Sequence, residues 1–179
     1  APELVTKEMR RLAKAINFGI VYGQGAPGLA RELGISRADA ARYIKHYFEV
    51  YSGVKEWIDK TVEAAKKDGF VSTFTGRRRT LPELKASNPH IRSFAERAAV
   101  NTPVQGGSAD IIKKAMIRIW GAIKGAGGVF MISQVHDELV FEVRDPLLEE
   151  TSALVKREME NAFPLIVPLK AKLKAGKNL

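Results

Sequence analysis

The sequence contains no cysteine among its 179 residues. This absence excludes disulfide bonds and zinc sites with thiolate ligands, and it favours an intracellular protein, because small secreted domains commonly depend on disulfides. The sequence also lacks a recognisable signal peptide and any apolar run of membrane-spanning length. We therefore expect a cytoplasmic protein with no membrane partner.

Acidic residues are scarce relative to basic ones. The chain has 20 Asp and Glu against 29 Lys and Arg, which gives a net charge of +9 at pH 7. Such a charge attracts polyanions, of which nucleic acid is the commonest, although solubility alone also explains it. With 45% hydrophobic residues the chain is long enough for one domain, or two small lobes, with a real core.

The chain begins at Ala1 without an initiator methionine and enters helical sequence almost at once. We expect a piece of a longer polypeptide, with a processed terminus as the alternative.

The first half of the chain is predicted to be helical. Thr6 is expected to cap a first helix that ends at Gly23, and a short helix that stops at Gly34 follows. Ser36 is expected to cap a long helix that bends at residues 52–53.

The second half is predicted to mix strands and helices. Residues 70–81 are typical of a hairpin with its turn near Gly76, and helical spacing covers 89–124 with an interruption around 101–110. Two apolar runs, 128–134 and 138–143, indicate a strand pair.

The last part of the chain is predicted to contain one helix and one strand. Pro146 is expected to open a helix that runs to about Phe163. Residues 167–175, "VPLKAKLKA", are expected to form an exposed edge strand, because their lysines suit solvent.

One stripe of the first predicted helix carries two cations and then two aromatic rings. It comprises Arg10, Lys14, Phe18 and Tyr22. At about 100° per residue the four fall within an arc of about 120°, and apolar residues lie opposite. Cations in the first turns conflict with the helix dipole, and a bound phosphate would resolve that conflict. A solvated basic face with two aromatics in the core explains the same spacing.

The stretch "QVHDELVFEV" places a histidine and two acids between the two predicted strands: His136, Asp137 and Glu138. Adjacent carboxylates at a strand junction suit divalent cations. Solvated turn residues are the alternative. A metal phosphohydrolase of the His-Asp type is disfavoured, because His46 and His90 are the only other histidines.

Three ordered motifs resemble one family. "RRLAKAINFGIVYG" resembles motif B of family A DNA polymerases, "QVHDELVFE" resembles their motif C, and "NTPVQGGSADIIKKAM" resembles the stretch leading into their palm. The resemblance implies an α+β fold, with a helical fingers subdomain over 1–101 and a partial palm with a small antiparallel β-sheet over 102–179. It also implies template-directed DNA synthesis from dNTPs on a primer-template, in replication or repair.

The resemblance assigns roles to the stripe. The residues that match Arg10 and Lys14 bind the triphosphate of the incoming nucleotide, with Lys14 among the catalytic residues. The match to Phe18 packs on the sugar, and the match to Tyr22 occupies the templating-base position.

The resemblance also assigns contacts with primer and template. The residues concerned are Arg97, Asn101, Gln105 and His136. Donors in the minor groove can use acceptors present at every correct pair, so such contacts test geometry without reading sequence. Asn101 and Gln105 can alternatively cap or brace helices.

By the same resemblance, Asp137 is a direct metal ligand and Glu138 an auxiliary acid in a site for two Mg²⁺ ions. The two-metal route needs a further carboxylate, which the family provides from an upstream motif A. No such motif occurs in the sequence. We therefore expect a companion polypeptide or a missing upstream segment that carries motif A and the thumb. The alternative is a non-catalytic fragment that binds DNA and nucleotide.

The run Arg77, Arg78 and Arg79 follows the predicted hairpin turn. Template phosphates would attract these arginines without sequence preference, and acids of the fingers would do so equally well. The sequence does not distinguish which arginine contacts DNA.

Overall fold

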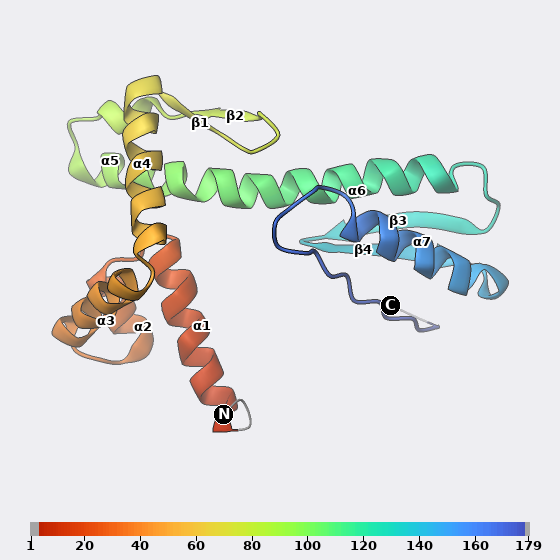
Figure 1. Ribbon diagram of the computed structural model, residues 1–179, viewed down its shortest axis with the longest axis horizontal. Coiled ribbons are helices and arrows are strands. Elements are labelled where there is room, and N and C mark those ends of the chain that lie inside the picture. Colours follow the sequence, from red (N-terminus) through yellow and green to blue (C-terminus); the bar gives the residue numbers. More distant parts are fainter. Residues whose placement is uncertain (1–3, 178–179) are drawn as a thin grey trace. The chain divides into compact units, whose positions relative to one another are not determined.

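The computed structural model describes residues 4–177. The chain divides into two compact units, Ala1–Val104 and Gln105–Leu179, and each has its own apolar core. Helices dominate, and two small antiparallel sheets accompany them (Figure 1). The predicted α+β fold is confirmed. Among the described residues no helix is long and apolar enough to cross a membrane.

Three helices open the first unit: α1 (Lys7–Val21), α2 (Ala26–Leu33) and α3 (Arg37–Val50). The predicted caps are confirmed, because the Thr6 hydroxyl accepts from the Met9 N–H and the Ser36 hydroxyl accepts from the Asp39 N–H. Gly34 ends α2 at φ 67°, a left-handed conformation that glycine adopts easily. The three helices share a core of buried side chains, namely Ile20, Leu29 and Ala40.

The predicted long helix is two helices in the structure. The chain leaves helical geometry at Tyr51 (φ −109°, ψ 55°), and α4 (Ser52–Asp68) begins directly after it. Ser52 and Gly53 are weak helix formers, and here they allow a full break where the sequence indicated a bend.

The predicted hairpin is confirmed as β1 (Phe70–Ser72) and β2 (Arg78–Thr80), which pair antiparallel. Gly76 lies in its turn at φ 87°. A short 3₁₀ helix (Pro82–Lys85) and α5 (Pro89–Asn101) follow. This part of the first unit has a second core, made of Ala65, Val71, Leu81, Leu84, Ala95, Ala98 and Ala99.

The predicted interruption of the next helix is a π-helical turn, Thr102–Gly106, between α5 and α6 (Gly107–Ile123). Pro103 lacks a backbone N–H, so the regular hydrogen-bond ladder cannot pass through it unchanged. Wider turns of this kind are frequent at functional positions in helices.

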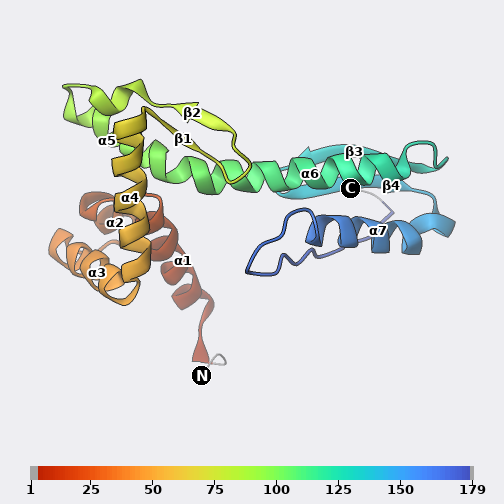
Figure 2. The same ribbon diagram turned by 45° about the horizontal axis from the view of Figure 1, so that its top comes forward.

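The second unit packs helices on one face of a hairpin. It contains α6, β3 (Val129–Val135), β4 (Glu138–Val143), a 3₁₀ turn (Asp145–Leu147) and α7 (Leu148–Glu160). Both views show α6 and α7 running beside this sheet (Figures 1 and 2). Its core comprises Ala115, Ile119, Ile123, Val129, Val155 and Ala162. Val129 pairs with Val143 and Val135 with Glu138, which confirms the predicted strand pair.

The predicted last strand is wrong. Residues 161–177 form neither helix nor strand. The Ala171 N–H donates to a side chain, Glu160 Oε1, at 3.0 Å. An edge strand needs a neighbour for its backbone groups, and among the described residues the β3–β4 sheet has two strands only.

Candidate nucleotide and nucleic-acid binding site

The stripe on α1 forms a continuous row of side chains. Lys14 Nζ lies 5.6 Å from the centre of the Phe18 ring, and the Phe18 and Tyr22 rings stack with centroids 5.8 Å apart at 25°. Phe18 is 48% exposed, so it is not part of the core. Tyr22 is half-buried. A cation followed by one exposed ring and a second ring stacked nearly parallel to it can hold an anionic group beside a flat apolar surface.

The two arginines at the start of α1 are used differently. Arg11 binds Glu8 through two hydrogen bonds, of 2.6 and 3.0 Å, and this bond lowers the pKa of the Glu8 carboxyl. Arg10 is exposed and forms no ion pair or side-chain hydrogen bond with the described residues. Arg10 is therefore available to an external anion, whereas the charge of Arg11 is already matched.

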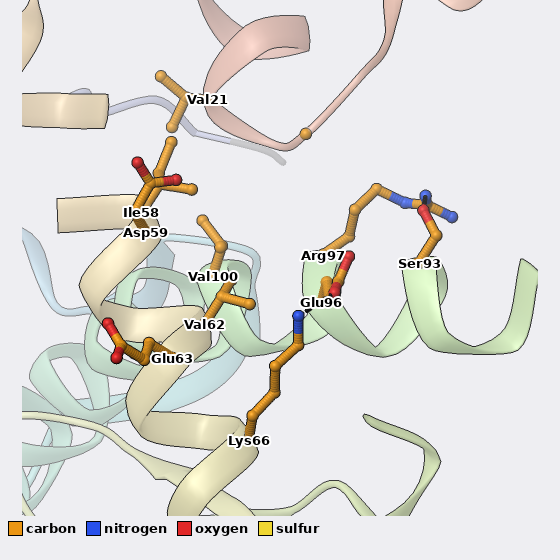
Figure 3. A pocket seen from close by; sticks show the side chains of 11 residues that line it. Val21, Ile58, Asp59, Val62, Glu63, Lys66, Ser93, Glu96, Arg97 and Val100 are labelled. Atoms are coloured by element: carbon orange, nitrogen blue, oxygen red, sulfur yellow. Dashed lines mark hydrogen bonds and ion pairs between the residues drawn. The ribbon is translucent and has the colours of Figure 1, made fainter. Parts of the chain in front are cut away.

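Arg97 lies on α5 in a cleft of about 560 Å³ that the end of α1, α4 and α5 line (Figure 3). Its guanidinium donates to Ser93 Oγ at 3.0 Å and lies 5.9 Å from the Phe94 ring. Lys66 and Glu96 form an ion pair of 2.6 Å on the same cleft. A Cβ added to Gly23 would lie 2.8 Å from Arg97 Cγ, so the arginine stem packs directly against the chain after α1.

Asn101 ends α5, and its side-chain carbonyl is buried with no hydrogen-bond partner in the structure. A buried oxygen without a donor costs free energy, and this oxygen therefore does not brace a helix through a hydrogen bond. Gln105 is exposed on the π-helical turn that follows.

The arginine run has partners within its own unit. Arg78 lies over the Phe70 ring at 4.6 Å, and Arg79 Nη1 donates to Thr102 Oγ1 at 3.3 Å. The Arg77 N–H donates to Thr73 Oγ1 at 3.2 Å. The contacts of Arg78 and Arg79 are not with carboxylates, contrary to the alternative of ion pairs with acids of the first unit.

The two acids predicted to bind metal, Asp137 and Glu138, lie at the turn between β3 and β4. The loop has two residues, His136 and Asp137, closed by the pairing of Val135 with Glu138. His136 has φ 53°, the one left-handed non-glycine residue in the described part of the chain. The Gln134 amide donates to the His136 carbonyl and holds the turn. Asp137 and Glu138 are both exposed.

These two carboxylates fit only part of a metal site. They offer the oxygen ligands that Mg²⁺ prefers. However, the residues from 4 to 177 contain no group of three or more His, Asp or Glu side chains that could hold a metal ion.

Two side chains that form hydrogen bonds near the stripe, Tyr47 and Gln24, were not predicted from the sequence. The Tyr47 hydroxyl donates to Asn17 Oδ1 at 2.8 Å, and Gln24 Nε2 donates to Glu32 Oε2 at 3.0 Å. Tyr47 is 30 residues from Asn17, so no local pattern signals the first contact.

Residues 1–179 match DNA polymerase family A along their whole length. The chain therefore belongs to DNA polymerase family A. It is 48% identical to DNA polymerase I of Bacillus subtilis (strain 168) over 177 residues, which is 98% of this chain and 20% of that protein. It is 45% identical to the thermostable DNA polymerase I of Thermus filiformis over 177 residues, 99% of this chain and 21% of that protein.

A solved structure agrees with these relatives. The POL domain of Pol1 from M. smegmatis, in complex with DNA primer-template and dNTP, is 48% identical with a TM-score of 0.89. The similarity covers 94% of this chain and 30% of that one. The chain thus spans about a fifth of the curated relatives and under a third of the solved domain.

Proposed function

We propose that this chain is the nucleotide- and primer-template-binding part of a DNA-directed DNA polymerase. The observation that carries the proposal is the continuous row on one helix of a family A chain, in which Lys14 and Phe18 are exposed and Tyr22 is half-buried. In this proposal residues 1–101 are the fingers and residues 102–179 a partial palm. The reaction of the intact enzyme is transfer of a nucleotide from a dNTP to a primer 3′-hydroxyl.

The row on α1 binds the incoming nucleotide in this proposal. Arg10 and Lys14 neutralise the triphosphate, which is most favourable near the positive end of the helix dipole. Phe18 offers its open face to the sugar, and Tyr22 occupies the templating-base position, where stacking on a ring accepts any of the four bases. The exposure of Phe18 supports its role, and that of Arg10 is supported because its side chain has no partner within residues 4–177.

The primer-template is bound by polar side chains of both units, namely Arg97, Asn101, Gln105 and His136. Arg97 offers a fixed cation to a phosphate, because Ser93 and Phe94 already orient its guanidinium. The side-chain carbonyl of Asn101 has no hydrogen-bond partner among the described residues, and its amide is proposed to donate to the minor-groove acceptors that every correct pair presents.

Asp137 is proposed as a ligand of a divalent metal, Mg²⁺, with Glu138 as an auxiliary acid. Two such ions, when bound, activate the primer hydroxyl and neutralise the leaving pyrophosphate. The remaining carboxylate comes from a companion polypeptide or an upstream segment that carries motif A. The role of this chain is therefore to present one exposed carboxylate on a tight two-residue turn.

A second candidate is a fragment that binds DNA and nucleotide without catalysis. The incomplete carboxylate set among the described residues favours this candidate for the chain by itself. Both candidates share the same binding surface, so they differ only in turnover.

Two measurements on the purified chain test the proposal. Fluorescence anisotropy of a labelled primer-template with added dATP measures binding, and extension with Mg²⁺ and four dNTPs measures turnover. We expect binding of the primer-template and of dATP, weaker dATP binding by Lys14→Ala, and no extension. Lys67→Ala, which removes an exposed lysine of α4, is the control and should bind normally.

Other outcomes are equally informative. Absence of both primer-template and dATP binding would contradict the proposal. Extension that Asp137→Asn abolishes and Asp145→Asn does not would confirm polymerase activity. That result would show that the chain needs no further carboxylate from another segment.

A further inference from the structure

Two residues of α1 flank the row, one on each side, and each is linked by hydrogen bonds to another part of the first unit. Asn17 contacts α3, and Gly19 is linked to α2 through Gln24. On a helical wheel that places Arg10 at 0°, Asn17 falls at about −20° and Gly19 at about 180°. The row Lys14, Phe18 and Tyr22 covers about 40° to 120°, so these two positions lie on either side of it. Contacts at both edges restrict how α1 can roll about its own axis.

Tyr47 of α3 holds the first edge. Its hydroxyl donates to Asn17 Oδ1 at 2.8 Å. The Tyr47 ring is packed between Phe48, at 5.6 Å, and Tyr51, at 4.8 Å, so its position does not depend on α1 alone. Burial, followed by the nearby Tyr51 hydroxyl, raises the pKa of Tyr47, and the hydroxyl therefore keeps its proton and remains a donor.

Gln24 holds the second edge. Its N–H donates to the Gly19 carbonyl at 2.8 Å, and its side-chain amide donates to Glu32 of α2 at 3.0 Å. A Cβ on Gly19 would lie 2.1 Å from Gln24 Oε1, so the glutamine side chain occupies the space that the glycine leaves open. The end of α1 is thereby joined to α2.

We propose that Tyr47 is a positioning residue, which through Asn17 fixes the roll of α1 and so aims the row Lys14, Phe18 and Tyr22 at the nucleotide. The inference rests on the proposed function, because it assumes that the row binds nucleotide. Tyr47 itself touches neither phosphate nor base. Since the three side chains lie on one stripe, a small roll of α1 would move all of them together and weaken every contact.

Affinity for dATP tests this role. Tyr47→Phe keeps the ring and its packing but removes the hydroxyl. It should weaken dATP binding about two- to tenfold, the range expected for one lost hydrogen bond. Tyr43→Phe on the same helix is the matched control, because Tyr43 is 50% exposed and has no such bond, and its affinity should be unchanged.

A double-mutant cycle separates a role through Asn17 from general destabilisation. In an Asn17→Ala background the hydroxyl of Tyr47 has lost its partner. Tyr47→Phe should then produce no further loss of dATP affinity. An equal loss in both backgrounds, or an unchanged affinity of Tyr47→Phe when the original chain binds dATP, would overturn the proposal.

Hydrogen exchange provides a readout that does not depend on nucleotide. Tyr47→Phe should accelerate exchange of the α1 amides and leave those of α4 and α5 unchanged. If the original chain fails to bind dATP, the nucleotide-binding part of the proposed function is contradicted, and hydrogen exchange alone then tests the role of Tyr47. Faster exchange confined to α1 then supports its hold on that helix, and unchanged exchange rejects it.

Discussion

At the scale of single residues, the contact between Gly23 and Arg97 joins the end of α1 to α5. Gly23 adopts φ 78°, a conformation that costs other residues roughly 1–2 kcal/mol. A side chain there would also meet Arg97 Cγ at 2.8 Å. Gly23 is thus constrained both by its backbone and by its neighbour, and the neighbour is a proposed DNA contact.

Gly23→Ala should therefore destabilise the first unit and displace Arg97. We expect a loss of about 2 kcal/mol or more in the free energy of unfolding, because strain and a clash act together. Gly34→Ala is the matched control: its φ is 67° with nothing within 4 Å of the new Cβ, so it should lose only about 1 kcal/mol. Urea unfolding measures both, and equal losses would show that the Arg97 contact is unimportant.

At the scale of elements, α3 carries Tyr47 and is itself fixed by its N-terminal cap. Ser36 Oγ donates to Asp39 Oδ2 at 2.7 Å and accepts from the Asp39 N–H at 3.0 Å. The Ser36 hydroxyl, followed by the Arg42 guanidinium, holds the pKa of the Asp39 carboxyl below its ordinary value. The folded state therefore binds the Asp39 proton less tightly than the unfolded chain does.

Acid should consequently weaken the start of α3. Because the pKa of Asp39 is lowered on folding, its contribution is complete above the unfolded value and is lost as pH falls through the folded value. Asp39→Ala should lose less stability between pH 6 and about pH 2 than the original chain does, by urea unfolding. Ser36→Ala, which removes the largest cause of the shift, should reduce the loss in the same direction. An identical acid loss in all three proteins would contradict this account.

Features of a helix that depend only on nearby residues could be predicted from the sequence. The caps at Thr6 and Ser36 are local, since each hydroxyl bonds an amide three residues on, and both were predictable. The row on α1 follows from helical periodicity alone. In contrast, the strand expected over residues 167–175 would need to pair with an edge of an existing sheet, and the β3–β4 sheet contains no third strand among the described residues, so the exposed lysines were misleading.

The contacts that hold the candidate site could not be read from the sequence. Tyr47 meets Asn17 across 30 residues, and Arg79 meets Thr102 across 23. Such pairs depend on how helices and hairpins pack, which no periodicity encodes. Likewise, the weak helix formers Ser52 and Gly53 indicated only a bend in the predicted long helix. The non-helical conformation of Tyr51 instead divides it into two helices.

At the scale of the whole molecule, the chain is two units with separate cores. Leu29 in the first and Ile119 in the second are the largest fully buried side chains among the described residues. Leu29→Ala should destabilise the first unit and Ile119→Ala the second, each by about 2–5 kcal/mol. Hydrogen exchange resolved by segment should show each loss confined to one unit. A loss spread evenly over both units would indicate a single cooperative structure.

The central claim is that these residues supply the nucleotide site and one catalytic carboxylate of a family A polymerase. The most direct test replaces the matching residues of a DNA polymerase I relative with this chain and measures primer extension with Mg²⁺ and four dNTPs. We expect the chimera to extend the primer and Asp137→Asn to abolish extension while primer-template binding persists. A folded chimera that binds primer-template without extending it, or that extends equally well with Asp137→Asn, would contradict the claim.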